Sequence, residues 1–258
     1  MPRSHGFRRL AGRGAGMDEI ERGAYRAQLR SRREEILQRI DEAARASGRQ
    51  GSEVGLLAVS KTVGPLELRL AWEAGFRAFA ENRPQELSRK LEAARDLAGV
   101  RFDMIGNLQT NKVNQVIGKV ELVHSVSSER LADAIARRSL ARQITTRVLL
   151  EVNVGGEASK SGFAPEELEG GIEGMLDLEG IEICGLMTMA PKGMPDEARR
   201  CFFGLRELRD GLRARTGLGL DVLSCGMSDD FQIAVEEGSN LVRLGRTIFD
   251  PNYVPKQG

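Results

Sequence analysis

The stretch LLAVSKT, residues 56–62, stands just before a Gly64-Pro65 break that opens a helical pattern. A short run of β-forming residues closed by one lysine predicts a buried strand with Lys61 at its carboxyl end. Burial there would lower the pKa of the Lys61 amine and favour the neutral, nucleophilic form that condenses with an aldehyde. On this segment alone, a lysine that only ends a strand and points to water remains the favoured interpretation.

The same strand pattern recurs along the chain and alternates with helix-like stretches, such as residues 87–97 and 202–212. Several of the strands are short apolar runs, as expected when both faces of a sheet are covered. Eight such units in about 200 residues predict an α/β fold, a single TIM-type (β/α)8 barrel. The predicted strands are Gly55–Ser60, Ala78–Glu81, Phe102–Gly106, Leu122–Ser125, Arg147–Val154, Ile181–Met189, Val222–Ser224 and Leu241–Leu244.

Two segments precede the first strand. Residues 18–47 have a charged helical pattern and are expected to form a helix added to the barrel. Residues 1–16 are basic and glycine-rich without an acid, which indicates a disordered extension or a true start at Met17. No Pro/Gly/Ser linker divides residues 17–258, so we expect one domain. A doubly wound open sheet is the alternative, but no GxGxxG follows a strand.

Composition excludes several kinds of protein. The chain has 38 basic and 37 acidic residues, a balance that does not indicate a nucleic-acid or membrane-surface partner. Its three cysteines lie far apart and it has only two histidines, so neither a structural zinc site nor a disulfide framework is expected, and a cytoplasmic location fits. No apolar run is long enough for a membrane span. No apolar stripe demands a partner subunit, so a monomer is the default expectation.

The predicted strands end in polar or glycine-rich residues, which is where a TIM barrel places its active groups. A single asparagine or serine at such a point is more often a turn or helix cap than a ligand. Their accumulation on one rim nevertheless favours a binding site. The residues concerned are Lys61, Asn82, Gly106-Asn107, Ser125, Asn153, Met187-Thr188, the run Ser224–Ser228 and the run Arg243–Thr247.

The loops after the seventh and eighth strands are where TIM barrels commonly bind phosphate. Gly226 would let a ligand approach the backbone closely, and Ser228 is placed to cap a helix beginning near Asp229, whose free amides would attract an anion. Asp229 and Asp230 favour the helix dipole but would repel a phosphate unless their side chains turn away. The sequence leaves their direction open.

A rim with one nucleophilic amine and an opposed phosphate site suits pyridoxal 5′-phosphate. Its aldehyde would condense with Lys61, and its phosphate would anchor the far end. Arg243 would then face the pyridine nitrogen and disfavour its protonation, because two adjacent positive charges repel. A salt bridge at the barrel end is the other interpretation of Arg243.

Several motifs follow one another with the order and spacing of one known family. They are AVSKT (58–62), ENRPQE (81–86), IGNLQTNK (105–112), HSV (124–126), KSGF (160–163), GLMTM (185–189), SCGMSDDF (224–231) and RLGRTIF (243–249). Over roughly residues 18–250, the chain resembles the pyridoxal phosphate homeostasis proteins, single-domain barrels related to the N-terminal domain of alanine racemase. The resemblance implies intracellular proteins that bind the cofactor, buffer or deliver it to apoenzymes, and have no established catalytic turnover.

By this resemblance, Lys61 carries the cofactor as a Schiff base, Asn82 lies beside its ring and Arg243 approaches the ring nitrogen. Ser228, Gly245 and the residue after it hold the phosphate. No catalytic or metal-binding residue is expected. The implied cofactor-binding set is Lys61, Asn82, Gly226, Met227, Ser228, Arg243, Gly245 and Arg246.

The chain departs from the family pattern at three places. Arg246 stands where a small hydroxyl residue is usual, and could either pair with phosphate or swing outward. Ala80 replaces a common glycine, and Cys225 replaces a usual methionine, where an inert packing thiol is favoured over a redox-sensitive one.

Two kinds of enzyme are the rivals of a carrier. An alanine-type racemase needs a second base, a tyrosine from an added β-domain, and the tyrosines here, Tyr25 and Tyr253, are at no predicted strand end. A Schiff-base aldolase usually takes its lysine from a later strand. A non-catalytic binding protein is therefore the preferred interpretation.

Overall fold

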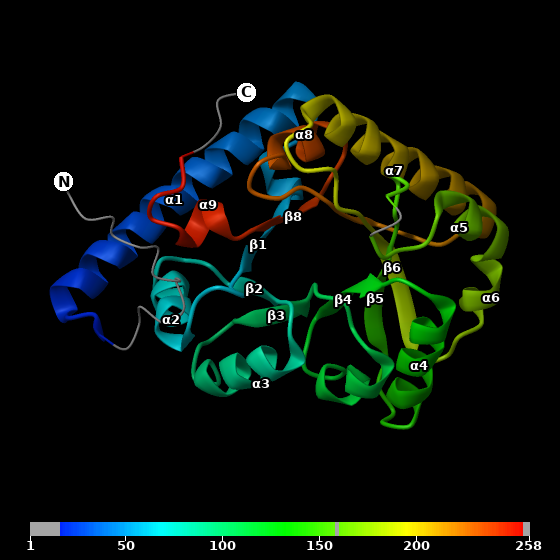
Figure 1. Cartoon of the computed structure of the whole chain (residues 1–258), viewed down its shortest axis with the longest axis horizontal. Coiled ribbons are helices and arrows are strands. Elements are labelled where there is room, and N and C mark those ends of the chain that lie inside the picture. Colours follow the sequence, from blue (N-terminus) through cyan, green and yellow to red (C-terminus); the bar gives the residue numbers. More distant parts are fainter. Residues whose placement is uncertain (1–15, 158–159, 255–258) are drawn as a thin grey trace, which may run out of the picture.

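A computed structural model describes residues 16–157 and 160–254; residues 1–15, for which an extension was expected, lie outside the described residues. Eight parallel strands close a barrel in the order β1 to β8, with β1 hydrogen-bonded to both β2 and β8 (Figure 1). The predicted barrel is thus confirmed, and the open-sheet alternative is wrong. The strands are β1 (Gly55–Val59), β2 (Ala78–Glu81), β3 (Arg101–Met104), β4 (Leu122–Val126), β5 (Thr146–Glu151), β6 (Ile181–Met187), β7 (Val222–Ser224) and β8 (Leu241–Leu244).

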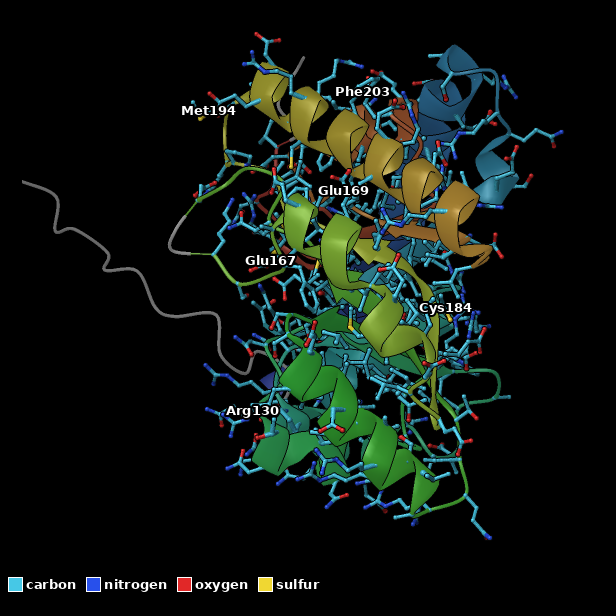
Figure 2. The ribbon with its side chains drawn as sticks, turned by 90° about the vertical axis from the view of Figure 1, so that its right-hand side faces the viewer. Arg130, Glu167, Glu169, Cys184, Met194 and Phe203 are labelled. Atoms are coloured by element: carbon cyan, nitrogen blue, oxygen red, sulfur yellow. The ribbon has the colours of Figure 1, made fainter. Side chains whose placement is uncertain are left out.

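Helices surround the barrel, and Figure 2 shows the side covered by α4, α5, α6 and α7. Short α8 and α9 follow β7 and β8 at the carboxyl end of the barrel. The helical elements are α1 (Glu19–Ala46), η2 (Gly51–Glu53), α2 (Pro65–Glu73), α3 (Pro84–Ala93), η3 (Thr110–Gln115), α4 (Glu129–Leu140), α5 (Pro165–Gly171), α6 (Glu173–Leu176), α7 (Pro195–Thr216), α8 (Phe231–Glu236) and α9 (Arg246–Phe249).

The additional helix α1 begins at a capping box, in which Asp18 and Glu21 each accept a hydrogen bond from the other's backbone amide. Its buried stripe includes Leu29, Ile36 and Ile40, as the spacing predicts, and it packs against α2, α8 and α9. Arg32 also donates to the carbonyl of Thr247 at 2.8 Å. The added helix therefore supports the segment that follows β8.

Alternation along the strands separates two apolar regions. Leu57 and Val59 pack with Ala78 and Ala80 in a small cluster inside the barrel, whereas Ala58 faces outward into the large core beneath the helices. Ala80 lies in this packed interior without distorting β2, so its replacement of a glycine has no visible structural effect.

In the part of the chain that the structure describes, no helix is long and apolar enough to cross a membrane.

Candidate functional site

Lys61 lies two residues beyond the end of β1, at the carboxyl rim of the barrel. Its side chain is exposed, so the expectation of an amine buried at the strand end is wrong: the strand stops at Val59, and Lys61 projects from the loop that leads to α2. A pocket of about 1000 Å³ opens beside it, and Arg246, Tyr25 and Phe249 contribute to the pocket wall. Lys61 is thus accessible to a ligand.

A buried ion pair holds the backbone immediately before Lys61. Lys90 of α3 donates to the carboxylate of Glu81 and, at 2.5 Å, to the carbonyl of Ser60. The hydroxyl of Ser60 donates to the same Glu81 oxygen at 2.6 Å. One buried ammonium group therefore joins the backbone just before Lys61 to the side chain of Glu81, the residue before Asn82.

Asn82 follows β2 and is partly buried. The rim is tightly packed here, since a Cβ atom added to Gly106 would lie 2.1 Å from the carbonyl oxygen of Asn82. Only glycine fits after β3 without displacing the backbone of Asn82. The hydroxyl of Ser125, on β4, donates to the carbonyl of Gly106 at 2.6 Å and so connects β4 to the loop after β3.

The loop after β7 brings Gly226 against β8. Gly226 has a φ of +95°, an L-residue would be strained there, and its carbonyl accepts from the amide of Arg243 at 3.0 Å. The side chain of Met227, next in the loop, is exposed. The expectation that Ser228 caps a helix near Asp229 is wrong. The helix α8 begins only at Phe231, and the hydroxyl of Ser228 instead accepts from the amide of Thr247 at 3.2 Å.

The loops after β7 and β8 therefore meet through Ser228. Gly245 lies against the end of β1, where an added Cβ atom would come within 3.3 Å of the Val59 carbonyl oxygen. The hydroxyl of Thr247 is buried without a hydrogen-bond partner among the described residues. The nearby hydroxyl of Tyr253 donates to the carbonyl of Ser228 instead, at 2.6 Å.

The directions of the two aspartates, which the sequence left open, are visible in the structure. Asp230 accepts from the amide of Met227 at 2.6 Å. Asp229 pairs with Arg246 at 2.5 Å, and the Arg246 guanidinium also lies over the Tyr253 ring, 5.6 Å from its centre. Arg246 thus neutralises a carboxylate beside the loop, while its side chain stays 52% exposed.

Arg243 is buried inside the barrel mouth. Its Nη1 donates to the carbonyl and the hydroxyl of Ser224 at 2.7 and 2.6 Å, and its Nη2 donates to the carbonyl of Thr188 at 3.0 Å. Burial lowers the pKa of Arg243, an effect that the charges of Asp230 and Glu151 only partly offset. A guanidinium nevertheless stays protonated in proteins, so Arg243 is a cation. No carboxylate is within salt-bridge distance of it among the described residues, which is against the alternative of a barrel-end salt bridge.

The thiol of Cys225, in the loop after β7, is fully buried, and desolvation raises its pKa to about 12. Almost no thiolate exists at neutral pH, so we expect Cys225 to resist iodoacetamide at pH 7.5 in the folded protein and to react after unfolding. Mass mapping of the alkylated peptides measures this. Labelling of the folded protein at the unfolded rate would contradict an inert packing thiol.

His124 is also buried inside the barrel, hydrogen-bonded to Asp103 and Ser224, with Arg243 as the nearby positive charge. Burial lowers its pKa, an effect that the hydrogen bond to Asp103 only partly offsets. As the pH falls below 6.5, the ordinary pKa of histidine, the unfolded chain therefore binds a proton that the folded protein does not bind. The free energy of unfolding falls as a result.

We therefore expect the stability difference between the wild type and His124→Asn to shrink between pH 7.5 and pH 5.5, by up to about 1.4 kcal/mol per pH unit. Urea unfolding at three pH values measures it. An equal difference at every pH would show that His124 titrates normally in the folded protein.

Comparison with known proteins identifies the family. The model of the alanine racemase N-terminal domain matches residues 32–252. The pyridoxal phosphate homeostasis protein of Aquifex aeolicus is 43% identical over 215 residues, which cover 83% of this chain and 94% of the relative. This chain belongs to the pyridoxal phosphate homeostasis protein family.

Solved structures agree with this assignment. PipY of Synechococcus elongatus was solved with pyridoxal phosphate bound; it is 31% identical, with a TM-score of 0.73 over 81% of this chain and 99% of PipY. Alanine racemase of Corynebacterium glutamicum, at 18% identity, a TM-score of 0.62 and coverage of 86% of this chain and 62% of the racemase, shares the fold alone.

Three residues near the site, Lys90, Asp103 and His124, were not predicted as parts of it. Lys90 looks like a surface lysine, since its partners on β1 and β2 are invisible until the barrel closes. Asp103 and His124 face the barrel interior, and strand alternation could have placed them there. Their polarity at inward positions is the signal that was available.

Proposed function

We propose that this chain binds pyridoxal 5′-phosphate as a Schiff base on Lys61 and buffers or delivers it in the cell, without a catalytic turnover of its own. In forming that bond, the Lys61 nitrogen joins the aldehyde carbon and the aldehyde oxygen leaves as water. The observation that carries the proposal is the accessible Lys61 amine on the same rim as the joined β7 and β8 loops. The name of the Aquifex relative and the cofactor in PipY support it.

The residues present fit this cofactor. Next to the Ser228 hydroxyl, the buried hydroxyl of Thr247 has no hydrogen-bond partner among the described residues, so this loop holds an unsatisfied polar group that a bound phosphate could pair with. Gly226 and Gly245 let these loops pack closely on the barrel, since a Cβ atom added to Gly226 would lie 2.7 Å from the Cβ atom of Ala234 and one added to Gly245 would lie 3.3 Å from the carbonyl oxygen of Val59. When bound, the cofactor would supply an aldehyde and an electron-withdrawing ring.

Each of the remaining site residues has a role in this proposal. Ser228, with the backbone of Gly226, Met227 and Gly245, would hold the phosphate, while Asn82 would flank the ring. Arg243 would face the ring nitrogen as a permanent positive charge and disfavour its protonation. Because its guanidinium is held by three acceptors on Ser224 and Thr188, it would need no rearrangement to do so.

A racemase is the second candidate that the fold allows, but the tyrosines do not favour it. Tyr253 donates to the Ser228 carbonyl, and Tyr25, which lines the pocket with Lys61, donates to the Phe249 carbonyl at 3.4 Å. Deuterium exchange at the α-carbon of L-alanine, in the presence of the protein and the cofactor, separates the two functions: a carrier gives none above the free cofactor.

The proposal extends to organisation and partners. Residues 17–258 would act as one cofactor-binding domain, as a monomer in the cytoplasm, and PLP-dependent apoenzymes would be its transient recipients.

Equilibrium dialysis tests whether the chain binds pyridoxal phosphate, with pyridoxal as the control that lacks the phosphate. We expect saturable binding of one pyridoxal phosphate per chain and much weaker binding of pyridoxal. Equal affinity for both compounds would contradict a phosphate-binding site in this protein.

Arg246 provides a test of the phosphate end. Because it lies beside the Ser228 loop and is paired with Asp229, we expect Arg246→Thr to weaken cofactor binding about three- to tenfold and to reduce its salt dependence. Asp229→Asn should strengthen binding, because a competing carboxylate is removed. Dialysis at several salt concentrations measures both.

Arg95→Thr is the matched control for Arg246→Thr, since Arg95 is another exposed arginine with an acidic partner, Glu92. A dissociation constant of the Arg246 variant that equals the control at every salt concentration would mean that the Arg246 side chain points to solvent.

A further inference from the structure

A chain of hydrogen bonds crosses the barrel interior from β3 to β8. An oxygen of Asp103 lies 3.0 Å from His124 Nε2, and His124 Nδ1 lies 3.0 Å from the Ser224 hydroxyl. Arg243 Nη1 lies 2.6 Å from that same hydroxyl. Each of the four side chains is at least nine-tenths buried. The chain ends at Arg243, but Asp103 and His124 belong to none of the loops that form the proposed site.

The proton positions in this chain follow from what each group can donate. A guanidinium only donates, so the Ser224 oxygen accepts from Arg243. The hydroxyl proton of Ser224 must then go elsewhere, and His124 Nδ1 is its partner. Nδ1 therefore carries no proton, and Nε2 carries one and donates it to Asp103. Only this tautomer of neutral His124 gives each of the three hydrogen bonds one donor and one acceptor.

We infer that Asp103 and His124 are positioning residues for Arg243, because together they fix the Ser224 hydroxyl so that its lone pair faces the guanidinium. If His124 carried its proton on Nδ1, two donors would face the Ser224 oxygen and its own proton would lose its acceptor. The Ser224 oxygen could accept from both donors, but its buried proton would have no acceptor, so the hydroxyl would no longer be held in one orientation against Arg243. We call the chain from Asp103 through His124 and Ser224 to Arg243 the relay. Its hydrogen bonds are argued from the geometry alone, and its effect on cofactor binding rests on the proposed function.

The order Asp–His–Ser also occurs in hydrolases, where the serine is a nucleophile. That function does not fit here. Ser224 has no exposed surface, and its oxygen already accepts from Arg243, so no substrate carbon can reach it. The arrangement orients a cation instead of activating a hydroxyl.

Nitrogen-15 NMR of the histidine side chains tests the relay without any cofactor. The chain has only His5 and His124, so the spectrum of His124→Asn assigns the signals. At pH 7.5 we expect His124 to be protonated at Nε2 and unprotonated at Nδ1, with a larger Nδ1–H fraction in Asp103→Asn. A proton on Nδ1 in the wild type would overturn the inference.

Cofactor binding then tests what the relay does. We expect Ser224→Ala and His124→Leu to bind pyridoxal phosphate about tenfold more weakly and to shift its absorbance. His124→Asn should keep part of the affinity, since its amide oxygen can accept from Ser224. The matched control is Ser139→Ala, which removes a buried hydroxyl bond of 2.7 Å to Thr146, at the amino end of β5.

The outcomes separate the two proposals. Relay variants that match the Ser139 control in both affinity and absorbance would show a merely structural role and overturn the inference. If the wild type bound no cofactor at all, the proposed function would fail, and the NMR tautomer alone would decide whether the relay exists.

Discussion

Lys61→Ala is expected to abolish covalent attachment of pyridoxal phosphate and to leave the barrel folded. The Lys61 side chain is exposed and makes no hydrogen bond or ion pair among the described residues, so its loss removes the nucleophile without removing packing. Stability should change by no more than about 0.5 kcal/mol. Absorbance of the protein–cofactor mixture after gel filtration, together with urea unfolding, measures both effects.

Lys160→Ala is the matched control. Lys160 lies in another rim loop, where its amine is paired with Glu157 at 2.5 Å and is therefore less available as a nucleophile. We expect the control to keep full cofactor absorbance. Full absorbance in the Lys61 variant and its loss in the Lys160 variant would move the attachment site to Lys160.

Lys90→Met is expected to destabilise the fold by about 3–5 kcal/mol, because it leaves the carboxylate of Glu81 buried without a counter-charge. Both side chains are 0% exposed, and one Glu81 oxygen already has no partner. The change also frees the Ser60 carbonyl, so the loop that carries Lys61 should loosen. Urea unfolding and hydrogen exchange near residue 61 measure the two effects.

Two further variants isolate the cause. Glu81→Gln combined with Lys90→Met removes both charges and should recover much of the loss, since Gln can still accept from Ser60. Arg89→Met, on the exposed pair with Glu86, should cost less than about 1 kcal/mol. A Lys90 variant as stable as the Arg89 variant would contradict the importance of the buried pair.

The fold was predictable because it depends on local patterns. The segments Ala78–Glu81, Val222–Ser224 and Leu241–Leu244 are strands with the predicted bounds, since short β-forming runs between turn residues leave few alternatives. Where bounds shifted, as at Ser60, the reason is that a strand ends where its neighbour stops pairing. The last pairs of β1 are Ala58 with Leu244 and Val59 with Ala80.

The site was only partly predictable, because contacts between distant segments decide its details. Strand ends placed Lys61, Asn82 and Arg243 on one rim, but the partner of Ser228 is the amide of Thr247, nineteen residues away. The burial of Lys90 likewise depends on the closure of β1 against β2. A sequence read residue by residue carries no signal for such contacts.

Borohydride reduction of the protein with pyridoxal phosphate, followed by peptide mass mapping, tests whether Lys61 forms the bond to the cofactor. We predict one pyridoxyl adduct, on Lys61, and none on Lys160 or Lys90. Absence of any adduct in a protein shown to be folded would contradict this prediction, and Lys61 would then be only a lysine that ends a strand.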